Sequence, residues 1–258
     1  MAKASGGVSA LARAVRILDA FHEGVRDLTA TQVAERAGMP LSTVHRLLGD
    51  LVDLGLLERQ GDRGYRIGLR LWELAVRTPG ALGIREIARP FLLQAHAAIG
   101  QSVQLGILQG TDVLYLERLS APSSVVNFVV IGGRLPWYAT SSGLVLAAYE
   151  ESETRAALLA SSRPVHAFEP ALSSAQLQKV LLDIRRRGHM TTPGYIHPDA
   201  TSVAVPIKGV LGGTVAAISA IVPTASPREA RVLEVLLPTS AAITRALRRT
   251  YGGRYAPA

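Results

Sequence analysis

Residues 28–48, LTATQVAERAGMPLSTVHRLL, carry the pattern that decides the fold of the first part of this chain. Thr29 followed by Gln32 predicts a capping box, because each side chain can accept from a backbone N–H that lacks a partner at a helix start. Gly38 predicts the end of that short helix. Pro40 then predicts the start of a second helix, since proline tolerates the first turn.

The second helix is predicted to have one apolar face and one polar face. Its apolar residues recur at spacings of three and four, as in an amphipathic helix: Val44, Leu47, Leu48, Leu51 and Leu54. The opposite face holds Ser42, which can also cap the helix, and Thr43, His45, Arg46 and Gly49. Two short helices around a glycine turn form a helix-turn-helix, and a small polar and basic face fits the major groove of DNA. The alternative is an ordinary solvated face.

A hairpin pattern follows this helix. Residues 56–59 and 65–67 are predicted strands, joined by a turn whose glycines can adopt positive φ. A hairpin directly after a recognition helix is a wing. Upstream, a helical stripe predicts a third helix that closes the core: Leu11, Ala14, Val15, Leu18 and Phe21. The residues predicted to contact DNA are Thr31, Ser42, Thr43, His45, Arg46, Arg59 and Arg63.

Charge alone does not establish DNA binding here. The chain has a net charge of +8, but residues 1–80 hold eleven Lys or Arg against nine acidic residues, a net of +2. Phosphate neutralisation is local, so affinity must depend on where a few side chains point. Those side chains are Arg46, Arg59, Arg63 and Arg66.

Length and composition set the domain organisation. A chain of 258 residues exceeds the usual size of one domain. We expect a winged helix-turn-helix with its linker helix at 1–80 and a second domain at 81–258. The chain is 48% hydrophobic and has no apolar run near eighteen residues, which favours a soluble protein. It has no cysteine and no secretory-signal pattern at the N-terminus, which predicts a cytoplasmic protein without disulfides.

The second domain reads as α+β. A helix is predicted around residues 84–95, and three consecutive β-rich runs follow at 103–108, 113–119 and 125–131. Further helices are predicted at 142–150, 151–160, 173–187 and 227–249, with strands at 203–208 and 214–222. Strands grouped between helices indicate a largely antiparallel sheet.

Several of these stretches resemble one family. STVHRLL (42–48), LGLLE (54–58) and YRIGLRL (65–71) resemble the winged-helix domain of IclR-family bacterial transcriptional regulators. VQLGIL (103–108), ATSSG (139–143), RGH (187–189) and AAIS (216–219) are similar, in order and spacing, to that family's effector-binding domain. The resemblance implies a GAF-like second domain, a homodimer or homotetramer, a pseudopalindromic double-stranded DNA operator and a small-molecule effector, a carboxylic acid.

The resemblance also implies which residues line the effector pocket. Carried over to this chain, they are Leu135, Trp137, Ser141, Ser142, Thr192, Ala200, Ser202, Ser219 and Ile221. Hydroxyls and helix-start N–H groups near Ser141 can bind a carboxylate without a full protein charge. The alternative is that these are ordinary small packing residues.

Three departures from the family pattern bear on the ligand. The acidic stretch after Arg-Gly is replaced by MTTPGY at 190–195, the usual cysteine by Ser202, and a common basic residue by Leu144. A less charged pocket favours an aromatic or otherwise bulkier acid over a small keto acid. His189 and His197 could hold a metal, but surface positions without one are the preferred interpretation, and we expect no metal and no cofactor.

Enzyme motifs are missing from the sequence. It has no Gly-x-Ser-x-Gly elbow, phosphate-binding loop, His-Glu-x-x-His or Gly-x-Gly-x-x-Gly. The main hypothesis is therefore an effector-responsive transcription factor and not an enzyme. Two alternatives remain: a ligand-binding or catalytic domain that uses the winged helix as a protein-interaction module, and a ligand-independent architectural regulator.

Overall fold

In this computed structural model the chain divides into two compact units, Met1–Pro79 and Gly80–Ala258. The structure describes residues 9–21, 27–61, 64–75, 77, 81–122, 124–125, 127–225 and 229–252. Among these residues, no helix is long and apolar enough to cross a membrane.

The first unit is a winged helix-turn-helix, as predicted. Its elements are α1 (Ala10–Asp19), α2 (Ala30–Ala37), α3 (Leu41–Asp53), β1 (Leu57–Arg59), β2 (Tyr65–Ile67) and α4 (Leu69–Ala75). Strands β1 and β2 pair antiparallel. Leu28 adds an isolated bridge to Tyr65, so the segment before α2 is held against the wing.

Local side-chain chemistry explains where α2 begins and ends. Thr29 Oγ1 accepts from Gln32 N at 3.3 Å and Gln32 Oε1 accepts from Thr29 N at 2.9 Å, so the capping box is confirmed. Gly38 ends the helix with φ 61°, which glycine adopts without a steric penalty. Helix α3 begins after Pro40 with no side-chain cap. The capping role predicted for Ser42 is wrong, because Ser42 lies inside the first turn.

The core of the first unit differs from the predicted stripes at two places. Val44, Leu47, Leu48 and Leu51 are buried as predicted, but Leu54 follows the end of α3 and is 66% exposed. In α1 the buried residue is Ile17, whereas Leu11 is 77% exposed and Val15 is also exposed. Ala14, Leu18 and Phe21 pack against the core only in part. The face of α1 that packs inward is therefore turned from the predicted one.

The second unit is built around one antiparallel sheet of six strands. Its strands, in the spatial order of the sheet, are β5 (Arg134–Pro136), β4 (Asp112–Leu119), β3 (Ser102–Gln109), β8 (Thr214–Pro223), β7 (Ala200–Lys208) and β6 (Met190–Pro193). Its α-helices are α5 (Ala81–Ile99), α6 (Ser141–Tyr149), α7 (Ser152–Ala160), α8 (Ser174–Arg187) and α9 (Glu229–Tyr251). A short 3₁₀ helix, η2 (Trp137–Ala139), precedes α6. The predicted α+β class is confirmed.

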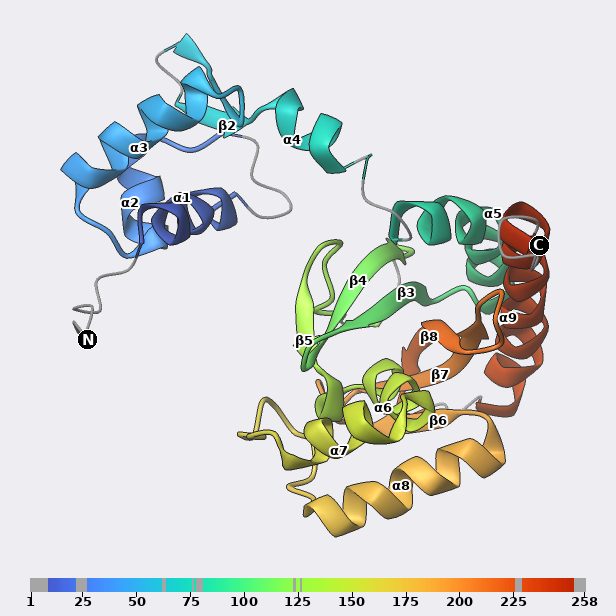
Figure 1. Ribbon diagram of the computed structural model, residues 1–258. Helices are drawn as coiled ribbons and strands as arrows, with labels where there is room; N and C mark the ends of the chain where they lie inside the picture. Colours follow the sequence, from blue (N-terminus) through green and yellow to red (C-terminus); the bar gives the residue numbers. More distant parts are fainter. Residues whose placement is uncertain are drawn as a thin grey trace. The chain divides into compact units, whose positions relative to one another are not determined.

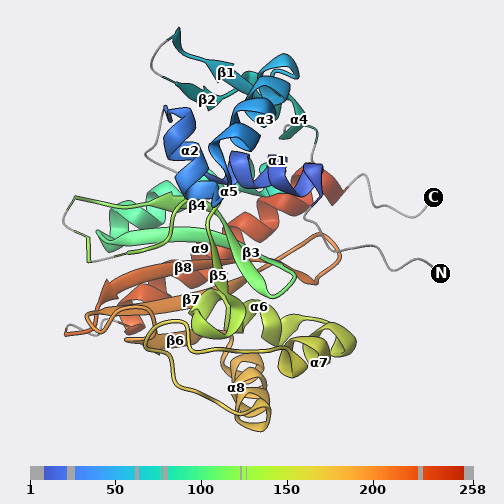
Figure 2. The ribbon, with the colours of Figure 1, turned by 90° about the vertical axis from the view of Figure 1, so that its left-hand side faces the viewer.

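Helices cover both faces of this sheet. Figure 1 shows α5 and α9 along one face and α6 and α8 on the other, and the turned view of Figure 2 agrees. The first face buries an aliphatic core that includes Leu92, Leu105 and Leu236. The second face buries another core, which includes Tyr115, Trp137 and Leu146. Each layer thus hides the apolar side of its neighbour, which is the main stabilising contribution.

The predicted strand at 125–131 is wrong. Residues 124–125 and 127–130 have no regular secondary structure, and the third consecutive strand is the shorter β5. The run is apolar because it covers the sheet rather than joining it: Val129 is buried while Phe128 is 60% exposed. Strand β6 was also missed, since its sequence is short and polar.

A buried carboxylate anchors α5 on the sheet. Glu117 on β4 is 3% exposed and pairs with Arg85 Nη2 at 3.1 Å and Arg89 Nε at 3.2 Å. The backbone N–H of Arg118 also donates to it at 3.1 Å. A buried charge without such partners would cost several kcal/mol. The cluster therefore has a structural role.

Candidate functional sites

One face of α3 carries the polar side chains predicted to meet DNA. Ser42, His45 and Arg46 are exposed, and Thr43 is half-buried beside them. The opposite face of the helix carries the buried leucine stripe, so the side chains of the polar face do not pack in the core. Thr31 is exposed in the first turn of α2 and Arg59 is exposed at the end of β1. Arg63 lies outside the residues that the structure describes.

Two ion pairs modify this surface. Arg46 Nη1 contacts Asp50 Oδ2 at 3.2 Å, one helical turn along α3. Arg66 Nη2 contacts Glu58 Oε2 at 2.6 Å across the hairpin, and this interaction lowers the pKa of Glu58. Arg66 is thus held by its neighbour, while Arg46 pairs with an acidic side chain that sequence reasoning overlooked. The i, i+4 spacing of Arg46 and Asp50 would have revealed it.

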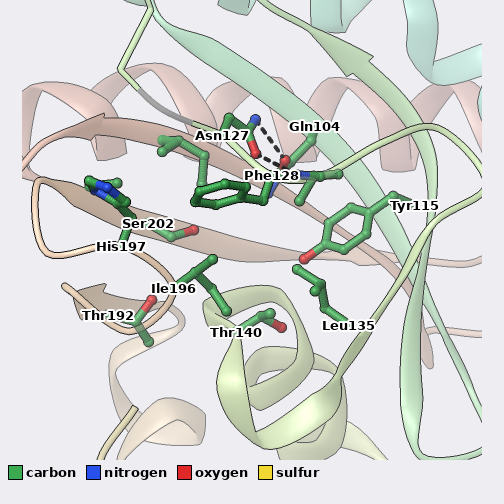
Figure 3. Close-up of a pocket in the computed structure, with 13 residues that line it drawn as sticks. Gln104, Tyr115, Asn127, Phe128, Leu135, Thr140, Thr192, Ile196, His197 and Ser202 are labelled. Atoms are coloured by element: carbon green, nitrogen blue, oxygen red, sulfur yellow. Dashed lines mark hydrogen bonds between the residues drawn. The ribbon is translucent and has the colours of Figure 1, made fainter. Parts of the chain in front are cut away.

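A small cavity lies on the sheet face of the second unit, where α6 begins. Figure 3 shows it between the strands, the start of α6, and two coil segments that bear Phe128 and His197. Its volume is about 40 Å³. It is lined by Gln104, Tyr115, Asn127, Phe128, Val129, Leu135, Thr140, Thr192, Ile196, His197, Ala200, Ser202 and Ile221.

The cavity brings together part of the predicted effector set. Five of the predicted residues line it: Leu135, Thr192, Ala200, Ser202 and Ile221. Four do not, because they are sealed in the layer behind the lining: Trp137, Ser141, Ser142 and Ser219. All four are at most 1% exposed. Trp137 instead belongs to the core beneath α6.

The two serines that begin α6 are hydrogen-bonded to serines of the sheet. Ser141 Oγ lies 2.5 Å from Ser202 Oγ, and Ser142 Oγ donates to Ser219 Oγ at 3.0 Å. Thr140 caps α6 by accepting from Gly143 N at 3.0 Å. The start of α6 is therefore fixed against β7 and β8 by hydroxyl contacts.

The lining is neutral and rich in hydrogen-bonding groups. No Lys, Arg, Asp or Glu belongs to the described lining residues. Burial raises the pKa of Tyr115 to about 12, partly opposed by hydrogen bonds with Thr140 and Ser142, so the phenol stays protonated at neutral pH. A ligand would meet amide, hydroxyl and imidazole groups beside apolar side chains, a lining that suits an aromatic compound with one or two polar groups.

His197 is one of the residues that line the cavity. The backbone N–H of Asp199 donates to its Nδ1 at 3.2 Å. Its ring lies 5.9 Å from that of Phe128, centroid to centroid. Across the described part of the chain, no three His, Asp or Glu side chains group as metal ligands.

Sequence reasoning missed eight of the thirteen lining residues. They are Gln104, Tyr115, Asn127, Phe128, Val129, Thr140, Ile196 and His197. Gln104 and Asn127 each left a signal, as a polar residue inside an otherwise apolar strand pattern. The others depend on how the coil segments fold back over the sheet.

A winged helix-turn-helix followed by a separate domain with a small internal cavity defines a class, the DNA-binding transcriptional regulators with a sensory domain. Residues 10–61 match the family described as "IclR helix-turn-helix domain", and residues 77–245 match "Bacterial transcriptional regulator IclR C-terminal". The chain belongs to the IclR family.

Known relatives agree with this assignment. The chain is 30% identical over 247 residues to HTH-type transcriptional regulator XynR of Escherichia coli, covering 93% of this chain and 97% of XynR. It is 29% identical to the Pca regulon regulatory protein of Pseudomonas putida over 90% of this chain and 82% of that protein. These relatives are named as regulators, so the chain is a transcriptional regulator and not an enzyme.

A solved structure is similar over nearly the same length. An IclR homologue from Microbacterium hydrocarbonoxydans, crystallised as a complex with 4-hydroxybenzoate, shares 38% identity with a TM-score of 0.83. The match covers 93% of this chain and 100% of the Microbacterium homologue.

Proposed function

We propose that this regulator binds a specific operator through α3 and the wing, and that an aromatic carboxylate in the cavity changes its operator affinity. The neutral lining, which places hydrogen-bond donors beside Tyr115, Phe128 and Leu135, is the observation that carries the ligand class. The 4-hydroxybenzoate complex of the Microbacterium homologue supports the same class. Carboxylate charge would be met by neutral donors, which form strong bonds to ionised groups.

The operator is proposed to be a pseudopalindrome bound by a dimer. In a symmetric dimer the two recognition helices meet half-sites about one turn of DNA apart. Exposed apolar side chains on the first unit favour association: Leu11 is 77%, Leu69 66% and Trp72 63% exposed. Large apolar side chains that are exposed in one chain can be buried against a second copy when a dimer forms.

The size of the cavity suggests how binding alters the protein. A cavity of about 150 Å³ is known to take a benzene ring, whereas this one has about 40 Å³. An aromatic acid therefore requires the cavity to widen, by movement of lining side chains such as those of Phe128 and His197. A ligand changes DNA affinity only if it binds the two arrangements unequally, and the coupling is reciprocal.

A paired binding experiment tests this function. Operator affinity is measured by mobility shift with and without 4-hydroxybenzoate, and ligand affinity by calorimetry with and without operator. We expect the two affinities to change by the same factor, with pyruvate as a poor ligand for comparison. Ligand binding without sequence-specific DNA binding would support the alternative of a ligand-binding domain with an interaction module.

The cavity assignment predicts different outcomes for two serines, Ser202 and Ser142. Ser202 lines the cavity, so Ser202→Leu should fill it and abolish the response to 4-hydroxybenzoate while operator binding persists. Ser142 is 1% exposed and lies behind the lining. Ser142→Leu should overpack the core and destabilise the protein by about 1 to 3 kcal/mol.

Both serine variants are compared by melting curves and by operator titration with ligand. Ser202→Ala serves as the matched control, since it removes the hydroxyl but leaves the space open. A normal ligand response in Ser202→Leu contradicts the assignment of the cavity.

The wing predicts a sequence-independent effect. Arg59 is exposed at the end of β1 and has the reach of a phosphate contact. Arg59→Ala should weaken binding to all DNA sequences alike and reduce the slope of log affinity against log salt by about one. Titrations at several salt concentrations, on operator and on unrelated DNA, measure both. A loss confined to the operator would assign Arg59 to base readout instead.

A further inference from the structure

The side-chain amides of Gln104 and Asn127 are hydrogen-bonded to each other at the cavity. Gln104, on the central strand β3, is 2% exposed and lines the cavity. Asn127 Nδ2 donates to Gln104 Oε1 at 3.3 Å, and Asn127 Oδ1 accepts from Val129 N at 3.0 Å. Figure 3 shows Asn127 above the cavity, joined to Gln104 by a dashed line. This chain of hydrogen bonds runs from the coil segment to the sheet.

Only one assignment of donors and acceptors fits these hydrogen bonds. The two ends of an amide have nearly the same shape, so their orientation is decided by their partners. A backbone N–H only donates, and Val129 N therefore requires the oxygen of Asn127. The Asn127 nitrogen then faces Gln104 and requires its oxygen. Gln104 Nε2 is the group left over.

Gln104 Nε2 is therefore a donor of fixed orientation whose N–H groups have no acceptor among the described residues. Within the part of the chain that the structure describes, it makes no hydrogen bond to protein. A polar group on so deeply buried a side chain normally has a partner. Because Gln104 lines the cavity, Nε2 is available to donate to a molecule inside it.

We propose that Gln104 is a specificity-determining residue for the effector, donating from Nε2 to an acceptor oxygen of the bound molecule, and that Asn127 is the positioning residue that fixes this donor. The inference rests on the proposed function, since it concerns the same cavity. Ligands with an oxygen acceptor at this point are favoured, and those that present only a donor there leave two donors face to face.

The test is a double-mutant cycle read by calorimetry with 4-hydroxybenzoate. Gln104→Met keeps the length of the side chain and removes the donor. Asn127→Asp still accepts from Val129 but can no longer donate, so Gln104 turns its nitrogen toward Asp and its oxygen into the cavity. Each single variant should weaken binding at least about tenfold, as expected for a lost hydrogen bond to a charged group.

The double variant shows whether Asn127→Asp weakens binding by releasing Gln104 or by placing a new negative charge near the ligand. If Asn127 acts only through Gln104, adding Asn127→Asp to Gln104→Met causes no further loss. A further loss equal to that of the single variant means that the new carboxylate repels the ligand directly, which overturns the positioning role. Unchanged affinity in Gln104→Met overturns the donor role. Melting curves accompany each variant, and Gln104→Met, which adds no charge, carries the test if Asn127→Asp does not fold.

A ligand-free measurement distinguishes failure of this inference from failure of the proposed function. In NMR spectra of the free protein, the Gln104 side-chain NH₂ protons should show contacts to other lining residues such as Tyr115 and Ile221, and Asn127→Asp should remove them. Absence of these contacts in the unchanged protein overturns the orientation. If they are present but no aromatic acid binds, the effector class is wrong and the donor stands.

Discussion

Replacing Gly143 with alanine is expected to destabilise the second unit severely. A Cβ at this position would lie 2.2 Å from the carbonyl oxygen of Trp137 and 2.5 Å from its Cα. Both are backbone atoms of the 3₁₀ turn before α6, so no side-chain rotation relieves the clash. The cost should reach the upper end of overpacking, about 3 kcal/mol or more. In a unit of this size that lowers the melting temperature by roughly 6 to 12 °C.

The same substitution at Gly49 provides a control of opposite sign. Gly49 lies inside α3, and a Cβ there meets no heavy atom within 4 Å. Gly49→Ala should therefore stabilise the first unit by about 0.5 to 1 kcal/mol, because alanine loses less backbone entropy in a helix. Calorimetry of both variants measures the two shifts. A melting curve for Gly143→Ala that matches the unchanged protein would show that α6 is not packed as described.

Removing Arg46 is expected to produce the largest loss of operator affinity. Its side chain lies on the polar face of α3, where a guanidinium can contact a guanine edge. Arg46→Ala should weaken operator binding by about 1 to 3 kcal/mol and relax specificity at one base pair. Stability should hardly change, because the exposed pair with Asp50 contributes at most about 1 kcal/mol.

Two further variants show whether the ion pair or the base contact is responsible. Asp50→Asn removes the pair but keeps Arg46, so operator affinity should stay equal or rise. Arg186→Ala removes an arginine that forms a comparable exposed pair with Asp183 on α8 and should leave binding unchanged. An equal loss of binding in Asp50→Asn and Arg46→Ala would mean that helix stability, not readout, explains the effect. Mobility-shift titrations on the operator and on single-base variants decide between these results.

Arg46 shows how much of a functional site can be predicted from the local sequence pattern. Its place opposite the leucines follows from a period of 3.6, and that prediction holds for Val44 and Leu47. Its partner Asp50 also follows from helical spacing. In α1, by contrast, the predicted stripe omitted Ile17, the residue of this helix that is buried in the core with the other helices.

The residues that line the cavity were harder to predict, because their positions depend on the tertiary structure. The resemblance to a family pointed to small residues near α6, and Ser202 lines the cavity, whereas Ser141 and Ser142 are buried behind the lining. Which of two neighbouring small residues faces a ligand depends on the rotation of the helix start against the sheet. That rotation is set by the close approach of Gly143 to Trp137 and by hydroxyl contacts to β7 and β8.

Features that depend on neighbouring residues could be predicted from the sequence: the capping box at Thr29, the turn at Gly38, the antiparallel hairpin and the α+β class. The tertiary fold was needed to show that residues 127–129 cover the sheet instead of extending it, and that Asn127 contacts Gln104, 23 positions away in the sequence. Local elements form from interactions within one or two turns, which a sequence displays directly. A cavity and a fixed donor arise where segments distant in sequence meet, and their geometry exists only after the whole sheet has assembled.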